Sequence, residues 1–276
     1  MKNLIEKIKE TSNYIKEKVD FSPEIGLILG SGLGTLADEI EDSIILKYEE
    51  IPNFPVSTVK GHEGKLVFGT LEGKKVVAMK GRFHYYEGYS MQEITFPVRI
   101  MKELGVKMLL VTNACGGMNK EKLYPGALML IEDHINFMGD NPLIGPNYEE
   151  LGPRFPDMSH AYDKELIETA KKVGDKLGIK TEQGVYVAIS GPNYMSRAEL
   201  SMLRKLGADA LGMSTVPEVI VANHAGLRVL GISCVTDMAI ADEIESISHE
   251  QVIKVANETR PRFIQLVKGI VKEVIL

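Results

Sequence analysis

The chain has 276 residues, of which 44% are hydrophobic and 25% are charged, and these values are those of a folded protein with a substantial core. They exclude extensive disorder and a coiled coil. The formal net charge is −6 and no block of lysine or arginine stands out, so we expect binding neither to nucleic acid nor to a membrane surface.

The first stretch of the chain, residues 1–20, predicts an amphipathic helix. Apolar Leu4, Ile8 and Ile15 are interleaved with many charges, a pattern that lacks the apolar centre of a signal peptide. No window is apolar for long enough to span a bilayer. The two cysteines, Cys115 and Cys234, have the spacing of neither a disulfide framework nor a zinc site, so a reducing, cytoplasmic location and the absence of a metal are expected.

After this helix, runs of β-branched and aliphatic residues alternate with helical patterns. The candidate strands are residues 25–29, 66–71, 76–80, 108–112, 127–132, 185–190 and 228–235. The candidate helices are residues 90–104, 163–177, 197–206, 216–225 and 248–270. The alternation predicts one α/β domain over residues 1–276, with a mixed, largely parallel central β-sheet flanked by helices.

Several candidate strands are followed by short segments rich in glycine or small polar residues. These segments are residues 30–34, 81–88, 113–117, 191–194 and 236–237. In α/β sheets, ligands bind outside the carboxyl ends of the strands. We therefore expect these segments, read as loops, to share one pocket.

The segment 81–88, Gly-Arg-Phe-His-Tyr-Tyr-Glu-Gly, is a candidate for holding an anion. If the chain stays extended after strand 76–80, the pleat places Arg82 and His84 on the same side. Arginine offers a planar fork of donors for phosphate or carboxylate, and Glu87 could orient His84 or keep it protonated. A solvated surface loop is an equally good interpretation of this segment taken alone.

Two other segments combine a turn with hydroxyl groups. Residues 30–34 match neither the dinucleotide fingerprint nor a P-loop, which leaves either an anion-accepting turn with Ser31 or a plain tight turn. Residues 213–218 predict a helix start, with Ser214 or Thr215 near the cap, Pro217 in the first turn and Glu218 complementing the helix dipole. Capping alone explains that pattern, although a helix N-terminus can also hold phosphate.

Three further features are less specific. Tyr194 follows the turn Ser190-Gly191-Pro192 and could either stack on a planar ligand or plug the edge of the core. His62 lies between glycines and suits a mobile loop. Residues 141–156 are rich in proline and glycine but contain apolar residues, which favours a functional loop or a contact surface over a linker.

Taken together and in order, these segments resemble the trimeric purine nucleoside phosphorylases. The resemblance rests on residues 30–34, 61–62, 81–89, 111–114, 190–192 and 212–218. It implies reversible phosphorolysis of purine ribonucleosides or 2′-deoxyribonucleosides to the free base and (deoxy)ribose 1-phosphate. It also implies that inorganic phosphate is a co-substrate, that no metal or organic cofactor is needed, and that the chain forms a homotrimer.

The resemblance also assigns roles to individual residues. The phosphate-binding residues would be Ser31, His62, Arg82, His84, Ala114 through its amide, and Ser214. The ribose-binding residues would be Tyr86, Met213 and, at the 5′-hydroxyl, His249. The base-binding residues would be Tyr194, Met195, Thr236 and Asp237, with Phe155 reaching in from a neighbouring subunit. The catalytic residues would be Asp237, His84 and Glu87, the last orienting His84.

Two positions depart from the family members that are selective for guanosine and inosine. Those enzymes resemble one another in carrying Glu and Asn where this chain has Met195 and Asp237. Methionine offers no comparable acceptor for N1–H, and an ionised Asp would set one acceptor against another at O6. A protonated Asp237 could instead give its proton to N7 while accepting from a 6-amino group. We therefore expect a base site that accepts 6-aminopurines such as adenosine, and acceptance of 6-oxopurines as well stays open.

Other functions remain open at this point. Asp237 also resembles the methylthioadenosine phosphorylases, so S-methyl-5′-thioadenosine phosphorolysis is the first alternative, although the polar segment Ser248-His249-Glu250 favours ordinary nucleosides. A non-enzymatic nucleoside-binding protein would not explain the cluster of Ser31, Arg82, His84 and Ser214. An NAD-linked oxidoreductase is disfavoured by the missing fingerprint, and a nucleoside hydrolase would release ribose without phosphate.

Overall fold

The computed structural model describes residues 3–58, 63–243 and 249–276, and within them one α/β domain is built on a mixed sheet of nine strands. The strand order is β2-β3-β4-β1-β5-β8-β7-β6-β9. Strand β9 pairs with β5 as well as β6, so the strands from β5 to β9 close into a ring, while β1 to β4 extend from it. The strands are β1 (Ile25–Leu29), β2 (Glu41–Lys47), β3 (Lys65–Leu71), β4 (Lys74–Lys80), β5 (Met108–Gly117), β6 (Leu128–Phe137), β7 (Thr181–Ile189), β8 (Ala210–Gly212) and β9 (Arg228–Met238).

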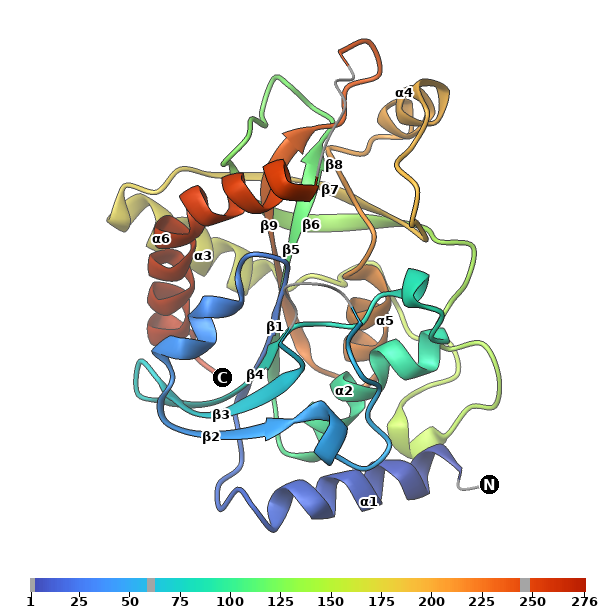
Figure 1. The fold of residues 1–276 in the computed structure, drawn as a ribbon, viewed down its shortest axis with the longest axis vertical. Coiled ribbons are helices and arrows are strands. Elements are labelled where there is room, and N and C mark those ends of the chain that lie inside the picture. Colours follow the sequence, from blue (N-terminus) through green and yellow to red (C-terminus); the bar gives the residue numbers. More distant parts are fainter. Residues whose placement is uncertain (1–2, 59–62, 244–248) are drawn as a thin grey trace.

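The helices cover both faces of this sheet (Figure 1). They are α1 (Leu4–Lys16), α2 (Met91–Glu103), α3 (Lys164–Leu177), α4 (Arg197–Lys205), α5 (Val216–His224) and α6 (His249–Glu273). Helices α3 and α6 lie side by side on one side of the central strands, and α2 and α5 lie together on the other. No helix in the described ranges is long and apolar enough to cross a membrane. The prediction of an α/β domain with a mixed sheet flanked by helices is confirmed.

The local sequence explains where most helices begin. Asn3, Ser90 and Ser196 each form a capping box with a glutamate three residues later, and the Asp163 side chain caps α3 by accepting from the Leu166 amide. Each such cap contributes about 1 kcal/mol because it satisfies amides that the helix itself leaves unpaired. Ser90 and Asp163 are also the first residues of two predicted helices, 90–104 and 163–177.

All seven predicted strands are present, but two observed strands were missed. Strand β2 is an edge strand that exposes most of its side chains, so it lacks the buried apolar run that marks the central strands. Strand β8 has only three residues, too few for a periodic pattern. Both are defined by pairing with distant strands, β2 with β3 and β8 with β5 and β7.

The segments 113–117 and 236–237 were predicted as loops, and this was wrong. Strands β5 and β9 pair in parallel beyond the apolar residues, as far as Gly117 and Met238, with a register shift after Cys115. Backbone pairing holds glycine and polar residues in a strand here because a neighbouring strand supplies their hydrogen bonds. Their side chains are thereby fixed on a rigid element.

Parallel pairing brings the predicted ligand-binding segments to one edge of the sheet. Strand β1 pairs in parallel with β4 and β5, and β5 pairs in parallel with β9. The carboxyl ends of these four strands therefore point the same way. All five residues of β1 are buried, so this edge is anchored in the core.

Candidate functional site

A cavity of about 410 Å³ lies at this edge of the sheet. It is lined by most of the residues that the sequence pointed to. These are Ser31, Arg82, His84, Tyr86, Ala114, Tyr194, Met195, Met213, Ser214, Thr236 and Asp237. The expectation that the strand-end segments share one pocket is thus confirmed, whereas the individual roles of these residues stay predictions.

Four predicted site residues do not line the cavity in the described part of the chain. Glu87 lies behind His84, and Phe155 is 88% exposed. His62 lies outside the described residues. His249 is the first residue of α6, and its side chain is not part of the described structure. A role for Phe155 therefore requires a second chain.

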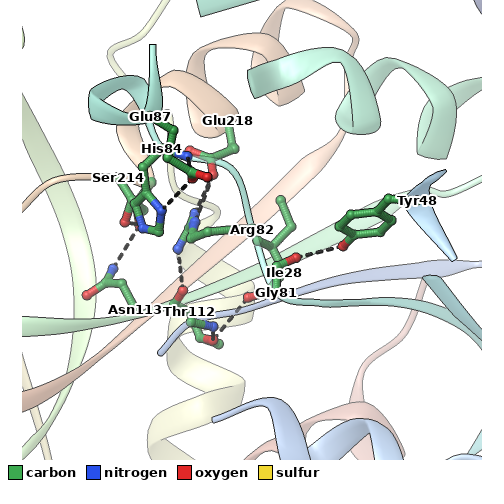
Figure 2. Close-up of polar contacts among 12 residues, drawn as sticks. Ile28, Tyr48, Gly81, Arg82, His84, Glu87, Thr112, Asn113, Ser214 and Glu218 are labelled. Atoms are coloured by element: carbon green, nitrogen blue, oxygen red, sulfur yellow. Dashed lines mark hydrogen bonds and ion pairs between the residues drawn. The ribbon is translucent and has the colours of Figure 1, made fainter. Parts of the chain in front are cut away.

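Arg82 is the most deeply buried charged side chain of the site, with 1% of its surface exposed. Its Nε and Nη2 donate to Oε1 of Glu218, at 3.0 and 2.5 Å, and its Nη1 donates to the Thr112 carbonyl oxygen at 2.6 Å (Figure 2). The preceding residue, Gly81, is held by a 2.6 Å hydrogen bond from the Tyr48 hydroxyl to its carbonyl oxygen. Both the backbone and the guanidinium of this segment are fixed before any ligand binds.

After β4, successive side chains point alternately toward the cavity and into the core. The Phe83 side chain is buried, and its ring lies 5.0 Å from that of Tyr48 in an aromatic cluster. Arg82 and His84, on either side of Phe83, both line the cavity. The predicted placement of these two side chains on the same side is confirmed, because Phe83 occupies the core position between them.

His84 is held by contacts on two sides. Its ring stacks on that of Tyr86, with centroids 4.7 Å apart and an angle of 14° between the planes. Its backbone amide donates to Oε1 of Glu87 at 2.7 Å, and Nδ1 lies 3.3 Å from the same oxygen. Burial lowers the pKa of His84, so the imidazole is neutral near pH 7. With Nδ1–H directed at Glu87, Nε2 is an acceptor suited to a protonated phosphate oxygen.

Glu87 is ionised despite its surroundings. Burial alone would raise its pKa, but hydrogen bonds from His84 and from both the amide and the hydroxyl of Thr58 hold the pKa at about 2. The two Thr58 groups lie 2.8 and 2.6 Å from Oε2. Glu87 therefore links the His84 ring to the segment that precedes residues 59–62.

Thr215 at the start of α5 has an unusual backbone. Its φ is 75° and its ψ is −55°, and the Val216 amide donates to the Ser214 carbonyl oxygen at 2.8 Å, which makes a three-residue γ-turn. A β-branched residue at positive φ is strained. The prediction that Ser214 or Thr215 lies near the cap is confirmed, because Thr215 is the N-cap residue of α5, although its side chain makes no capping hydrogen bond. The Thr215 hydroxyl instead accepts from Asn113 Nδ2 at 2.9 Å, and Ser214 lines the cavity.

The other end of the cavity holds Asp237. Burial raises the pKa of this carboxyl, and the Thr236 hydroxyl lies 2.9 Å from its Oδ1 and 3.2 Å from the Cys115 carbonyl oxygen. The hydroxyl donates to the carboxylate, which partly offsets the effect of burial on the pKa. The arrangement suits a carboxylic acid that can donate a proton.

The strand register sets the spacing between the two ends. Asp237 pairs with Gly116, which is two residues beyond Ala114 on β5. At about 3.3 Å per residue, the two positions are roughly 7 Å apart along the strand. A gap of this size can hold a five-membered sugar ring between an anion at Ala114 and a planar base at Asp237.

The aromatic and sulfur-containing residues complete the wall around this gap. Gly191 has a φ of 64°, and a Cβ at this position would come within 2.5 Å of the Met213 sulfur. The segment after β7 therefore rests directly on Met213. Tyr194 is 56% exposed at the rim of the cavity. The interpretation that its ring plugs the edge of the core is therefore wrong, and the ring is open to a ligand.

Several residues of the site escaped the sequence analysis. Leu200, Val252, Asn113 and Cys115 line the cavity, and Glu218 holds Arg82. Leu200 and Val252 fall inside predicted helices, and complementing the helix dipole accounted for Glu218 without a second role. Asn113 and Cys115 carried a signal, since both fall in the segment 113–117 that was singled out for ligand binding. The described residues contain no group of three or more His, Cys, Asp or Glu that could hold a metal ion.

Comparison with known proteins gives a consistent result. Residues 24–272 match the model of the phosphorylase superfamily. The chain is 58% identical over 268 residues to purine nucleoside phosphorylase 1 of Bacillus subtilis, covering 97% of this chain and 98% of the relative. It is 47% identical over 273 residues to purine nucleoside phosphorylase of Mus musculus, covering 95% and 93%. A structure of the Schistosoma mansoni purine nucleoside phosphorylase in complex with adenosine has a TM-score of 0.94 at 42% identity, covering 99% and 98% of the chains.

Proposed function

The chain belongs to the phosphorylase superfamily, among its purine nucleoside phosphorylases, and from this premise we propose that its base site accepts 6-aminopurine nucleosides such as adenosine. It is a pentosyltransferase that uses inorganic phosphate as co-substrate. The observation that carries the proposal is Asp237, a half-buried carboxyl at the base end of the cavity whose pKa is raised by burial. Both ribonucleosides and 2′-deoxyribonucleosides are included in the proposal.

The phosphate end of the cavity supports the first half of the reaction. Ser31, Arg82, His84 and Ser214 converge there from three separate segments of the chain. Hydrogen bonds from a guanidinium to phosphate contribute about 1.5 to 3 kcal/mol each. Phosphate held there would face the anomeric carbon C1′ of a ribose seated near Tyr86 and Met213. His62 and His249 remain part of the proposed phosphate and ribose sites.

The bond changes follow from this placement. As the glycosidic C1′–N9 bond breaks, the electron pair of that bond passes into the purine and positive charge develops on the sugar. A phosphate oxygen forms the new bond to C1′, which gives ribose 1-phosphate. The purine takes up a proton at N7, and protonated Asp237 is the proposed donor. Asp237 then has to regain a proton from solvent before the next turnover.

The base contacts argue for a 6-amino group. After Asp237 has given its proton to N7, its other oxygen can accept a hydrogen bond from the 6-amino group of adenine. In guanine or hypoxanthine that oxygen would instead face O6, which is also an acceptor. Met195, which also lines the cavity, supplies no acceptor for N1–H. Adenine lacks that hydrogen. Structures of the Schistosoma mansoni purine nucleoside phosphorylase are described in complex with adenosine and with inosine, and one of a Schistosoma purine nucleoside phosphorylase with guanosine, so the fold itself accommodates both kinds of base.

Three further parts of the proposal concern the whole protein. We propose a homotrimer in which Phe155, exposed in the single chain, contributes to the base site of a neighbour. No metal or organic cofactor is needed, since the proposed chemistry uses only phosphate and side chains of the protein. A cytoplasmic location fits the two cysteines, which are both free thiols.

The test compares phosphorolysis of adenosine, inosine, guanosine and S-methyl-5′-thioadenosine side by side, with and without phosphate. We expect phosphate-dependent release of adenine, and we expect Asp237→Asn to reduce kcat/KM for adenosine by about 100-fold while guanosine and inosine lose less. Asp163→Asn, which makes the same change in a surface ion pair with Arg228, should have no effect. Robust activity on guanosine with none on adenosine would contradict the proposed base preference.

A further inference from the structure

The buried ion pair between Arg82 and Glu218 joins two elements that are far apart in the sequence. Arg82 follows β4, and Glu218 lies in the first turn of α5, 136 residues later. The Glu218 residue is 3% exposed and does not line the cavity. The hydrogen bonds of Glu218 therefore reach the cavity through Arg82, which does line it.

The geometry of the pair fixes the plane of the guanidinium. Two of its nitrogens, Nε and Nη2, donate to the same oxygen of Glu218, and the third, Nη1, donates to the Thr112 carbonyl oxygen. Because the Nε–Nη2 edge is bound to Glu218 and Nη1 is bound to Thr112, the guanidinium has little freedom to rotate about the last bonds of the side chain. Figure 2 shows Arg82 held between Glu218 and Thr112 in this way.

The surroundings of Glu218 explain why its carboxylate faces Arg82 with one oxygen. That oxygen, Oε1, accepts both hydrogen bonds, while the buried Oε2 has no hydrogen-bond partner in the described ranges of the chain. The N-terminus of α5 places partial positive charge beside this carboxylate. The hydrogen bonds of Glu218 are thus directed to one side chain.

We propose that Glu218 is a positioning residue that aims the Arg82 guanidinium at phosphate. This inference rests on the proposed role of Arg82 as a phosphate ligand. A rigid guanidinium loses less freedom when the anion binds, so part of the ordering cost of binding is met during folding. Because Glu218 follows Ser214 in the same segment, the start of α5 would set two phosphate ligands at once.

A purely structural ion pair makes a different prediction. If the pair only stabilised the fold, its loss would lower the melting temperature and leave the phosphate KM of the remaining folded enzyme unchanged. A purely electrostatic effect predicts a lower KM for phosphate, because removing a negative carboxylate from beside the site favours binding of an anion. An increase in the phosphate KM would therefore indicate that the Arg82 guanidinium is no longer held in the orientation that binds phosphate.

The experiment measures steady-state kinetics of Glu218→Gln, Glu218→Asp and the control Asp163→Asn, with the melting temperature of each. For Glu218→Gln we expect the KM for phosphate to rise about tenfold or more, with the nucleoside KM within about twofold of the parent. Glu218→Asp keeps the charge and should recover part of the loss. Asp163→Asn removes a carboxylate from another arginine pair and should change neither KM.

Two outcomes would overturn the inference. One is a phosphate KM within about twofold of the parent in folded Glu218→Gln, and the other is equal rises in both KM values. If Glu218→Gln does not fold, Glu218→Asp gives the same comparison on its own. Failure of the proposed function would look different, because the unmodified enzyme would then release base at the same rate without phosphate.

Discussion

Asp237 shows at the scale of a single residue how burial changes chemistry. Its carboxyl lies at the end of β9, where burial raises its pKa and the Thr236 hydroxyl partly offsets that effect. The protonated form can donate a proton to a purine, which an ionised carboxylate cannot do. The same burial makes the ionised form costly for the folded protein.

This cost predicts a pH-dependent effect of Asp237→Asn on stability. Because the folded pKa lies above the unfolded one, the stability contributed by the protonated group is present below the unfolded pKa and is lost as the pH rises through the folded pKa. The melting temperature of Asp237→Asn should therefore exceed that of the parent at about pH 8, and the difference should be smaller at about pH 4. Thermal unfolding at both values checks this, and an equal difference at both would count against it.

A strand end and a helix start lie together at the proposed phosphate site. The extended segment after β4 presents Arg82 and His84, and the start of α5 presents Ser214 next to the strained Thr215. A side-chain hydrogen bond from Asn113 on β5 holds the Thr215 hydroxyl. The strain is maintained by these neighbours, because the α5 sequence alone would favour an ordinary cap.

Substitution of Thr215 separates this strain from function. In Thr215→Gly, relief of the strain and loss of the Asn113 hydrogen bond are each of about 1 to 2 kcal/mol and nearly cancel, so the melting temperature should change little. The KM for phosphate should nevertheless rise about tenfold, because Ser214 is no longer held. Thr215→Ser retains the hydroxyl and should keep the parent KM. Equal phosphate KM values for both variants would remove Thr215 from the phosphate site.

At the scale of the whole molecule, the proposed trimer draws attention to the segment 141–156. The buried Arg99 of α2 ties this segment to the domain, with Nη1 3.4 Å from the Leu151 carbonyl oxygen and 2.8 Å from His224 Nδ1. Phe155 at its end is 88% exposed and Ile144 is 65% exposed. Large apolar side chains on an anchored segment are typical of a contact surface.

We expect light scattering to show three chains per particle in solution. Phe155→Ala should raise the nucleoside KM several-fold and leave the phosphate KM unchanged, since the ring would contribute only to the base end of a neighbour's cavity. Ile275→Ala removes an equally exposed apolar side chain near the C-terminus and serves as the control. A monomeric enzyme, or unchanged nucleoside KM in Phe155→Ala, would refute the shared site.

Much of this protein could be predicted from its sequence because the signals are local. Apolar runs located the central strands, helical patterns located the helices, and the spacing of Arg82, Phe83 and His84 set which side each occupies. The order of short segments along the chain was enough to indicate the phosphorylases. The edge strand β2 and the three-residue β8 lacked such signals, since only their partner strands define them.

Tertiary structure alone decided how the site is held. Glu218 looked like a dipole-complementing residue and Thr215 like a cap until folding placed Arg82 and Asn113 beside them. The raised pKa of Asp237 likewise depends on burial by elements distant in the chain. The sequence determined which chemical groups are available and on which elements they lie. Their orientation and protonation depend on neighbours that only the folded sheet brings together, because hydrogen bonds and desolvation act over a few ångströms in space.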